Sequence, residues 1–249
     1  MVEYTMAEPH TVLILALDTT TRGGSIAVVR ETAVLALVAG DAARTHGERL
    51  PGEIAVALDR AGVPRTAIDL LAVATGPGAF TGLRIGLAAI QGLAMTLDRP
   101  VAGVSALDAL VSEAGEPGVE FIAAWMDAQR GDVFAALHQP SVASGFSRTI
   151  ELEPPIAASP VALLDRWRPR LERHTALFTG DAVTRDRDTI LAAGGGRWTT
   201  RVPGPLAPAI AALGLARARA GLAGPPHALT PIYVRRPDAE IERDRRTGG

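Results

Sequence analysis

The 249-residue sequence contains no cysteine and no lysine, so all 25 of its basic residues are arginines. Without cysteine the chain has no thiolate nucleophile, no thiolate metal ligand and no disulfide. Without lysine it also lacks the phosphate-binding lysine of a P-loop and the amine that forms a Schiff base. These absences exclude several classes of enzyme and leave hydroxyl, carboxylate, imidazole and guanidinium groups for any site.

Net charge and aromatic side chains are also scarce. The formal net charge is -2, and phenylalanine, tryptophan and tyrosine make up 4% of the chain. Neither a global attraction to nucleic acid nor a stacking surface for bases is therefore expected. The first apolar run, Val12–Leu17, is too short for a membrane span or a signal peptide. We expect a cytoplasmic protein without membrane contact.

Hydrophobic residues make up 47% of the chain, which is enough for one large core or two modest lobes. The pattern predicts an α/β fold with the order βββαβαβ in the first half and a repeat of this plan in the second. Asp18 and Asp127 each end the first strand of a half, at the mouth of a hairpin. We therefore expect two related lobes, each a mixed β-sheet with crossover helices. The expected divisions are a flexible extension at 1–10, an N-terminal lobe at 11–114, a smaller C-terminal lobe at 115–230, and a docking segment with a charged tail at 231–249.

A glycine-rich turn, Gly76–Gly86, is the most specific stretch of the sequence. It joins a predicted strand, Leu70–Thr75, to a long apolar helix. The free N–H groups at such a helix start could hold a phosphate, and the same turn could equally lead a strand into a closely packed helix. The expected start has Thr81 as N-cap, Gly82 as the first helical residue and a hydrophobic staple between Phe80 and Ile85.

Arg84 lies in the first turn of this helix, where a cation opposes the helix dipole. We expect a partner that offsets this cost. Two alternatives are open: a carboxylate within the chain, or a phosphate or partner carboxylate outside it.

Two helices carry apolar or small faces. In the helix after the glycine-rich turn, small residues at four-residue spacing would let another helix approach closely. An earlier helix is predicted by the capping-box pair Thr45 and Glu48. Pro51 conflicts with that start, so this helix either begins at Pro51 or is kinked there.

Several motifs together resemble the bacterial TsaB family, and they span almost the whole chain. They are Leu17–Thr20, Thr45–Pro51, Gly76–Gly86, Val104–Leu107, Asp127–Phe134 and Tyr233–Arg235. The glycine-rich segment differs from the family pattern mainly at Ala79, where serine is usual. The resemblance is consistent with the two-lobed fold of the actin, Hsp70 and sugar-kinase superfamily.

The resemblance implies a non-catalytic subunit needed to form N6-threonylcarbamoyladenosine next to the anticodon of tRNAs that read codons beginning with A. The implied partners are a TsaD-like catalytic subunit and a TsaE-like ATPase, with tRNA reached only through the complex. TsaB-like proteins use their first helices to contact TsaD or a second TsaB, so a self-dimer is also implied. The partner interface expected on this basis comprises His46, Leu50, Ile54, Leu58, Gly82, Gly86 and Ala89.

TsaD itself holds a metal partly through two histidines four residues apart on one helix. Here Leu50 stands four residues after His46, and none of the five histidines has a histidine at that spacing. We therefore expect no catalytic residue, no metal and no tightly bound cofactor.

In active kinases of the superfamily, the aspartate that corresponds to Asp18 holds the Mg²⁺ of a nucleotide. The second lobe is short and lacks an adenosine-binding glycine motif, so two alternatives are open. The aspartates either hold turns in a vestigial site, or help to bind ATP or ADP with Mg²⁺ at the boundary of a complex. The alternative function is that of a small-molecule phosphotransferase. The candidate residues are Asp18, Thr19, Thr20, Gly78, Thr81, Arg84 and Asp127.

Overall fold

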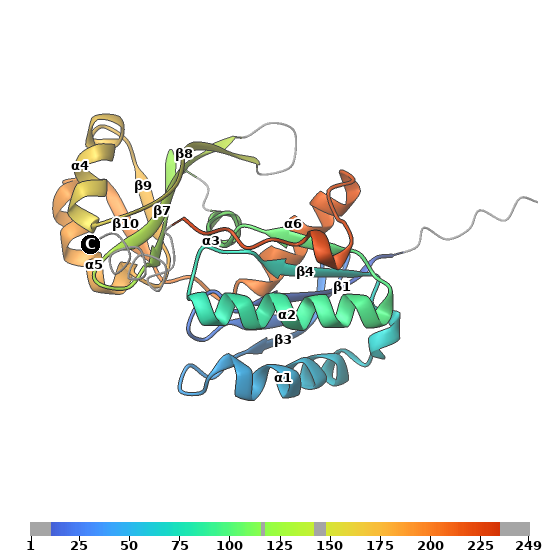
Figure 1. Cartoon of the computed structure of the whole chain (residues 1–249). Coiled ribbons are helices and arrows are strands. Elements are labelled where there is room, and N and C mark those ends of the chain that lie inside the picture. Colours follow the sequence, from blue (N-terminus) through green and yellow to red (C-terminus); the bar gives the residue numbers. More distant parts are fainter. Residues whose placement is uncertain (1–10, 116–117, 142–147, 235–249) are drawn as a thin grey trace, which may run out of the picture.

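The computed structural model describes residues 11–115, 118–141 and 148–234. Two five-stranded mixed sheets form the centres of two lobes (Figure 1). The first sheet has the order β3-β2-β1-β4-β5, and the second has the equivalent order β8-β7-β6-β9-β10. The expected α/β fold with two related mixed sheets and crossover helices is confirmed.

Each sheet combines an antiparallel meander with two parallel strands. The first consists of β1 (Leu13–Asp18), β2 (Ser25–Arg30), β3 (Ala33–Ala39), β4 (Leu70–Ala74) and β5 (Val101–Val104). The second consists of β6 (Phe121–Asp127), β7 (Val133–Ser141), β8 (Arg148–Ala158), β9 (Ala176–Thr179) and β10 (Trp198–Arg201). The helices are α1 (His46–Ala61), α2 (Phe80–Leu97), α3 (Ala106–Ala114), α4 (Pro160–Leu171), α5 (Val183–Gly194) and α6 (Ala207–Arg219), with short 3-10 turns η1 (Arg65–Ala67) and η2 (Pro226–Ala228). The sequence did not predict β10, a short strand whose Trp198 enters the second core.

The residues of β1 alternate between two cores. Leu15 and Leu17 share a cluster with buried residues of α1 and α2, whereas Ile14 and Ala16 share a cluster with α6. Because side chains alternate across a strand, β1 is buried on both faces, as its continuous apolar sequence requires. Its end at Asp18 therefore lies between two helical layers.

α6 covers the first sheet although it follows the second sheet in the sequence. It contacts β1, β2, β4 and β5, and Gly214 allows this approach, since a Cβ there would lie 2.7 Å from the Cβ of Ala72. α3 contacts both α6 and β6, and their shared core contains Ile14 of one sheet and Ile122 of the other. The expected boundary between 11–114 and 115–230 follows the order of the chain, whereas the packing places α6 with the first lobe.

α1 begins at His46, so Pro51 lies inside the helix and not at its start. The Glu48 carboxylate accepts hydrogen bonds from the backbone N–H of Thr45 at 2.9 Å and from its hydroxyl at 2.8 Å. This is the Glu48 half of the capping box that the sequence predicts.

α2 begins two residues earlier than the sequence predicts. Its N-cap is Ala79, whose carbonyl already accepts the Leu83 N–H at 2.9 Å. Thr81 therefore lies within the first turn, and the expected N-cap at Thr81 is wrong. Phe80 is inside the helix, so the expected staple with Ile85 is wrong as well.

By length and hydropathy alone α2 could span a membrane, a property that buried helices of globular proteins share. Leu83, Leu87, Ile90 and Ala94 belong to the core between α2 and the first sheet. This packing accounts for the apolar residues on one face of the helix.

The expected extension at 1–10 lies outside the described residues, as does 235–249 of the expected docking segment and tail. The described part, 231–234, contacts the first lobe, where the Ile232 N–H donates to the Thr75 carbonyl at 2.7 Å. This contact lies directly beside the glycine-rich turn.

Candidate functional site

The carboxylate of Asp18 is occupied by the turn that follows β1. Its Oδ1 accepts the Thr20 N–H at 2.8 Å and the Thr20 hydroxyl at 2.6 Å, and its Oδ2 accepts the Thr21 hydroxyl at 3.0 Å. Only 2% of Asp18 is exposed. These contacts fix the β1–β2 turn. They support the alternative in which Asp18 holds a turn.

The glycine-rich turn packs against the same β1–β2 turn. The Ala79 N–H donates to the Thr20 carbonyl at 3.0 Å. A Cβ at Gly78 would overlap Thr20, and a Cβ at Gly82 or Gly86 would overlap Thr19. Of the two functions that the sequence left open for this turn, close packing is the one that these contacts support.

His46 and Arg49 form a buried clamp beneath the β1–β2 turn. Nε2 of His46 lies 3.0 Å from the Thr21 carbonyl, and its Nδ1 lies 2.8 Å from Arg49 Nη2. One neutral tautomer fits both contacts, with Nε2–H donating and Nδ1 accepting. Burial is the main cause that lowers the pKa of His46, the carbonyl of Thr21 opposes it, and the charge of Arg49 adds to it. Arg49 is also paired with Glu53 at 2.6 Å.

The residues expected to contact a partner lie mostly inside the chain. Leu50 and Ile54 are core residues of the first lobe, and Leu58 packs against them. Gly82 and Gly86 are covered by Thr19, His46 is buried, and Ala89 is half-buried. Burial argues against direct partner contact by His46, Leu50, Ile54, Gly82 and Gly86, whereas for the half-buried Leu58 and Ala89 the interface stays a prediction. The apolar periodicity identified the faces of α1 and α2 that meet their own sheet.

A different set of residues faces outward on these two helices. We define the α1–α2 outer face as the exposed residues Gly52 and Val56 of α1 and Ala88, Gly92 and Met95 of α2. Figure 1 shows the two helices side by side along one face of the first lobe, and they contact each other. Met95 is 74% exposed and Val56 42%.

Within the described part of the chain Arg84 contacts two aromatic side chains and no carboxylate, and a partner outside the chain stays a prediction. Its guanidinium carbon lies 3.8 Å from the centroid of the Phe80 ring, and its Nε donates to the Tyr233 hydroxyl at 3.2 Å. Phe80 and Tyr233 contact each other, with ring centroids 5.6 Å apart. A cation–π contact and a phenol hydroxyl therefore offset the unfavourable helix dipole, and they link α2 to the C-terminal segment.

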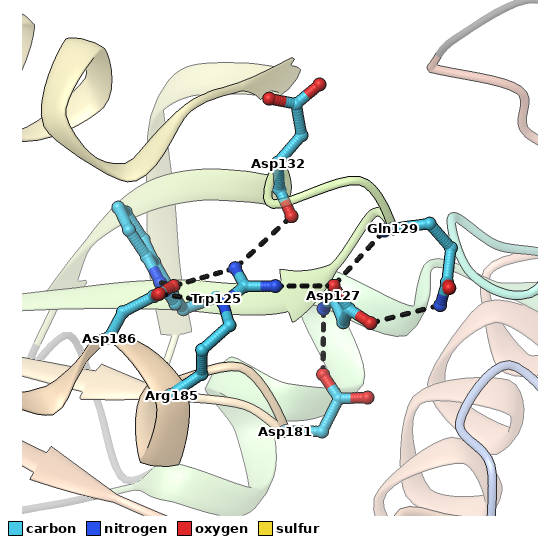
Figure 2. A network of polar contacts seen from close by, with 7 residues as sticks. All are labelled: Trp125, Asp127, Gln129, Asp132, Asp181, Arg185 and Asp186. Atoms are coloured by element: carbon cyan, nitrogen blue, oxygen red, sulfur yellow. Dashed lines mark hydrogen bonds and ion pairs between the residues drawn. The ribbon is translucent and has the colours of Figure 1, made fainter.

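Asp127, at the end of β6, is held in the polar network of Figure 2. Arg185 donates from Nη1 to Asp127 at 2.8 Å, and from Nε and Nη2 to the Asp186 carboxylate at 2.8 and 2.9 Å. Gln129 donates to Asp127 from its backbone at 3.1 Å and from its side chain at 3.0 Å. Asp186 also accepts from the indole of Trp125 at 2.8 Å. The network pairs Asp127 with a guanidinium that it shares with Asp186, and it joins β6 to α5.

A third aspartate lies between the two that the sequence singled out. Asp181 accepts the backbone N–H of Asp127 at 2.9 Å. Partial burial raises the pKa of the Asp181 carboxyl, and the negative charges of Asp127 and Asp18 raise it further. The structure therefore brings the ends of β1 and β6 into electrostatic contact between the lobes, with both expected aspartates already hydrogen-bonded within the chain.

Arg185 and Asp181 are the site residues that sequence reasoning missed. Both follow β9 and reach Asp127 only after the second sheet has folded. The Gly180–Asp181 pair directly after β9 was the available signal. Of the other candidates, Gly78 in the glycine-rich turn packs against Thr20, which follows Thr19 in the β1–β2 turn, whereas Thr81 and Arg84 are exposed on α2.

Comparison with known proteins agrees with this architecture. Residues 37–150 match the family model described as TsaD, tRNA N6-adenosine threonylcarbamoyltransferase. The tRNA threonylcarbamoyladenosine biosynthesis protein TsaB of Bacillus subtilis is 29% identical over 92% of this chain and 96% of its own length. The chain belongs to the TsaB family. The TsaB protein of Escherichia coli is 36% identical over 51% of this chain and 54% of its own length.

A solved structure extends the likeness to three dimensions. The structure described as YeaZ from Pseudomonas aeruginosa has a TM-score of 0.68 and 28% identity to this TsaB-family chain, covering 89% of the chain and 99% of that structure. The α/β fold with two mixed sheets is therefore shared with this solved structure.

Proposed function

We propose that this chain takes part in the biosynthesis of N6-threonylcarbamoyladenosine on tRNA, as the non-catalytic partner of a TsaD-like enzyme. The modified base would lie next to the anticodon of tRNAs that read codons beginning with A. The observation that carries this proposal is the likeness to TsaB of Bacillus subtilis over nearly the whole length of both chains. Similarity of residues 37–150 to the TsaD family model supports a pairing of two related folds.

The α1–α2 outer face is the surface we propose for the TsaD-like subunit. Its residues are small or apolar and lie on two adjacent helices, a composition that permits close helix packing. Met95 and Val56 contribute solvent-exposed apolar surface that a partner could bury. A second copy of this chain would compete for the same face. A TsaE-like ATPase would join the pair, and tRNA would be reached through the complex.

Nucleotide binding is proposed only at the boundary of that complex. Within this chain the oxygens of Asp18 and Asp127 accept hydrogen bonds from Thr20, Thr21, Gln129 and Arg185. A small-molecule phosphotransferase would need a free carboxylate for Mg²⁺. These contacts therefore favour the partner role over that alternative.

The test is co-expression with the TsaD-like protein of the same organism, followed by affinity capture and size exclusion. Ala88→Arg places a long charged side chain on the outer face, and we expect it to abolish capture. Thr189→Arg, at an exposed position of α5 on the other lobe, is the matched control and should leave capture intact. Equal capture by both variants, at unchanged melting temperatures, would exclude this surface. Failure of the unaltered chain to capture the enzyme would exclude the partner role.

A further inference from the structure

His138 in β7 is a buried histidine whose ring nitrogens are both unpartnered. Only 2% of the residue is exposed. Among the described residues, neither Nδ1 nor Nε2 has a hydrogen-bond partner. Buried polar side chains are normally hydrogen-bonded, because leaving one unpaired costs about 1–3 kcal/mol. The imidazole therefore lacks the partner that a buried ring nitrogen normally has, as far as residues 11–115, 118–141 and 148–234 are concerned.

Two carboxylates face this imidazole from different elements. Glu151 of β8 is the direct cross-strand neighbour of His138 in the β7–β8 register, and such neighbours share one face of a sheet. Asp108, in the first turn of α3, brings Oδ1 to 4.0 Å from His138 Nε2. One ligand atom of each residue lies within 4.8 Å of the other two. Three potential ligands thus converge where α3 meets the hairpin.

The separations are too long for hydrogen bonds and are close to those around a metal ion. Ligand atoms about 2.0–2.2 Å from a tetrahedral zinc ion lie roughly 3.3 Å apart. Asp108 and Glu151 are exposed, so their side chains can rotate inward by about 1 Å, whereas His138 is fixed by burial. Burial lowers the pKa of His138 to about 4, so its imidazole is neutral at pH 7 and keeps a lone pair for a metal.

We propose that Asp108, His138 and Glu151 bind one zinc ion, with the fourth position open to solvent. An imidazole ligand favours zinc and its transition-metal neighbours over Mg²⁺ and Ca²⁺, which prefer oxygen ligands alone. The cation would also relieve the repulsion between the two carboxylates. This proposal departs from the expectation of no metal, which rested only on the lack of a histidine pair four residues apart on one helix.

Such an ion would connect α3 to the β7–β8 hairpin. α3 contacts α6 as well as β6, β7 and β8, and so lies between the two lobes. Because Asp108 comes from α3 and the other two ligands come from the second sheet, binding would oppose separation of this helix from the sheet. The ion is proposed to stabilise this junction, independently of the proposed tRNA function.

The experiment uses the full chain without a histidine tag, stripped with EDTA. Zinc chloride is titrated by calorimetry, and the metal retained after dialysis is counted by mass spectrometry. We expect one zinc per chain, no displacement by millimolar Mg²⁺, and a melting temperature that rises with zinc. Co²⁺ serves as a spectroscopic probe, whose visible absorption should report the same site.

Asp108→Asn and Glu151→Gln change exposed carboxylates and should fold. Each should weaken zinc binding by about tenfold or more. His174→Ala is the matched control, since His174 is an exposed histidine that contacts one carboxylate, Glu120. Unchanged affinity in Asp108→Asn and Glu151→Gln, a loss in His174→Ala, or less than one zinc per unaltered chain would overturn the assignment. None of these measurements involves the TsaD-like partner, so they fail or succeed separately from the proposed function.

Discussion

The side chain of Thr19, in the turn after β1, lies directly over the Cα of Gly86 in the middle of α2. A Cβ at position 86 would overlap the Thr19 hydroxyl, which is itself buried without a hydrogen-bond partner among the described residues. The glycine face of α2 is therefore filled from within the chain. Substitutions at Gly86 report on folding, and substitutions on the outer face report on partners.

We expect Gly86→Ala to lower the free energy of unfolding by about 1–3 kcal/mol, because the added methyl group overpacks the contact with Thr19. Gly92→Ala is the matched control in the same helix, where a Cβ meets nothing within 4 Å. It should raise stability by about 0.5–1 kcal/mol through helix propensity. Urea denaturation of both variants checks the pair, and a stabilised Gly86→Ala would contradict the packing.

Arg185→Ala should destabilise the chain by about 1–3 kcal/mol, because it leaves the carboxylates of Asp186 and Asp127 without their cation. Asp186 is the more sensitive of the two, since only 7% of it is exposed. Arg187→Ala, two residues later and exposed, should change stability by less than about 0.5 kcal/mol. Thermal melts that rank the two variants equally would argue against the network.

Stability should fall between about pH 6.5 and pH 4, in part because of His138. Its folded pKa of about 4 is below the ordinary value of 6.5, so the unfolded chain binds the proton more tightly. The loss on acidification amounts to at most about 3 kcal/mol. Urea denaturation in EDTA across this range should give a shallower slope for His138→Gln than for the unaltered chain.

Other groups, among them His46 and Asp108, titrate in the same pH experiment. His46 also has a lowered pKa, so it contributes with the same sign and stays in the variant. Asp108 has a pKa raised by partial burial and by Glu151, with Arg217 opposing. Its contribution has the opposite sign, since it stabilises the fold at low pH and is lost as pH rises through its folded pKa. An identical slope in His138→Gln would exclude the histidine as a cause.

Millimolar Mg²⁺ and ATP should leave the melting temperature of the isolated chain unchanged within about 1 °C, because a ligand that does not bind the folded state cannot stabilise it. We expect no binding to the isolated chain, because the carboxylates of Asp18 and Asp127 already accept hydrogen bonds within it. The same addition should stabilise the complex with the TsaD-like subunit. A rise of several degrees for the chain alone would favour the phosphotransferase alternative.

Local signals in the sequence predicted most of the elements. The strand predicted at Leu70–Thr75 is β4 (Leu70–Ala74), which is one residue shorter, and the Thr45 and Glu48 pair marks the start of α1. Both depend on residues that are close together in the chain. β10 was missed because Trp198–Arg201 is only four residues long and carries a weak apolar pattern.

The contacts of the candidate site could not be predicted in the same way. Small residues at Gly82 and Gly86 indicate close approach, but not whether a partner chain or Thr19 fills the space. Arg84 meets Tyr233, which is 149 positions away. Such pairings depend on which segments the fold brings together, and a single sequence does not contain that information.

The position of α6 has a consequence for synthesis. One face of the first sheet is covered by a helix that leaves the ribosome about 115 residues after β5 ends. At roughly 5–20 residues per second, that face of the sheet stays uncovered for about 6–23 s. The first lobe therefore cannot finish folding ahead of the second, and a nascent chain stalled before Ala207 should be captured by holdase chaperones through the open side of β1 and β4.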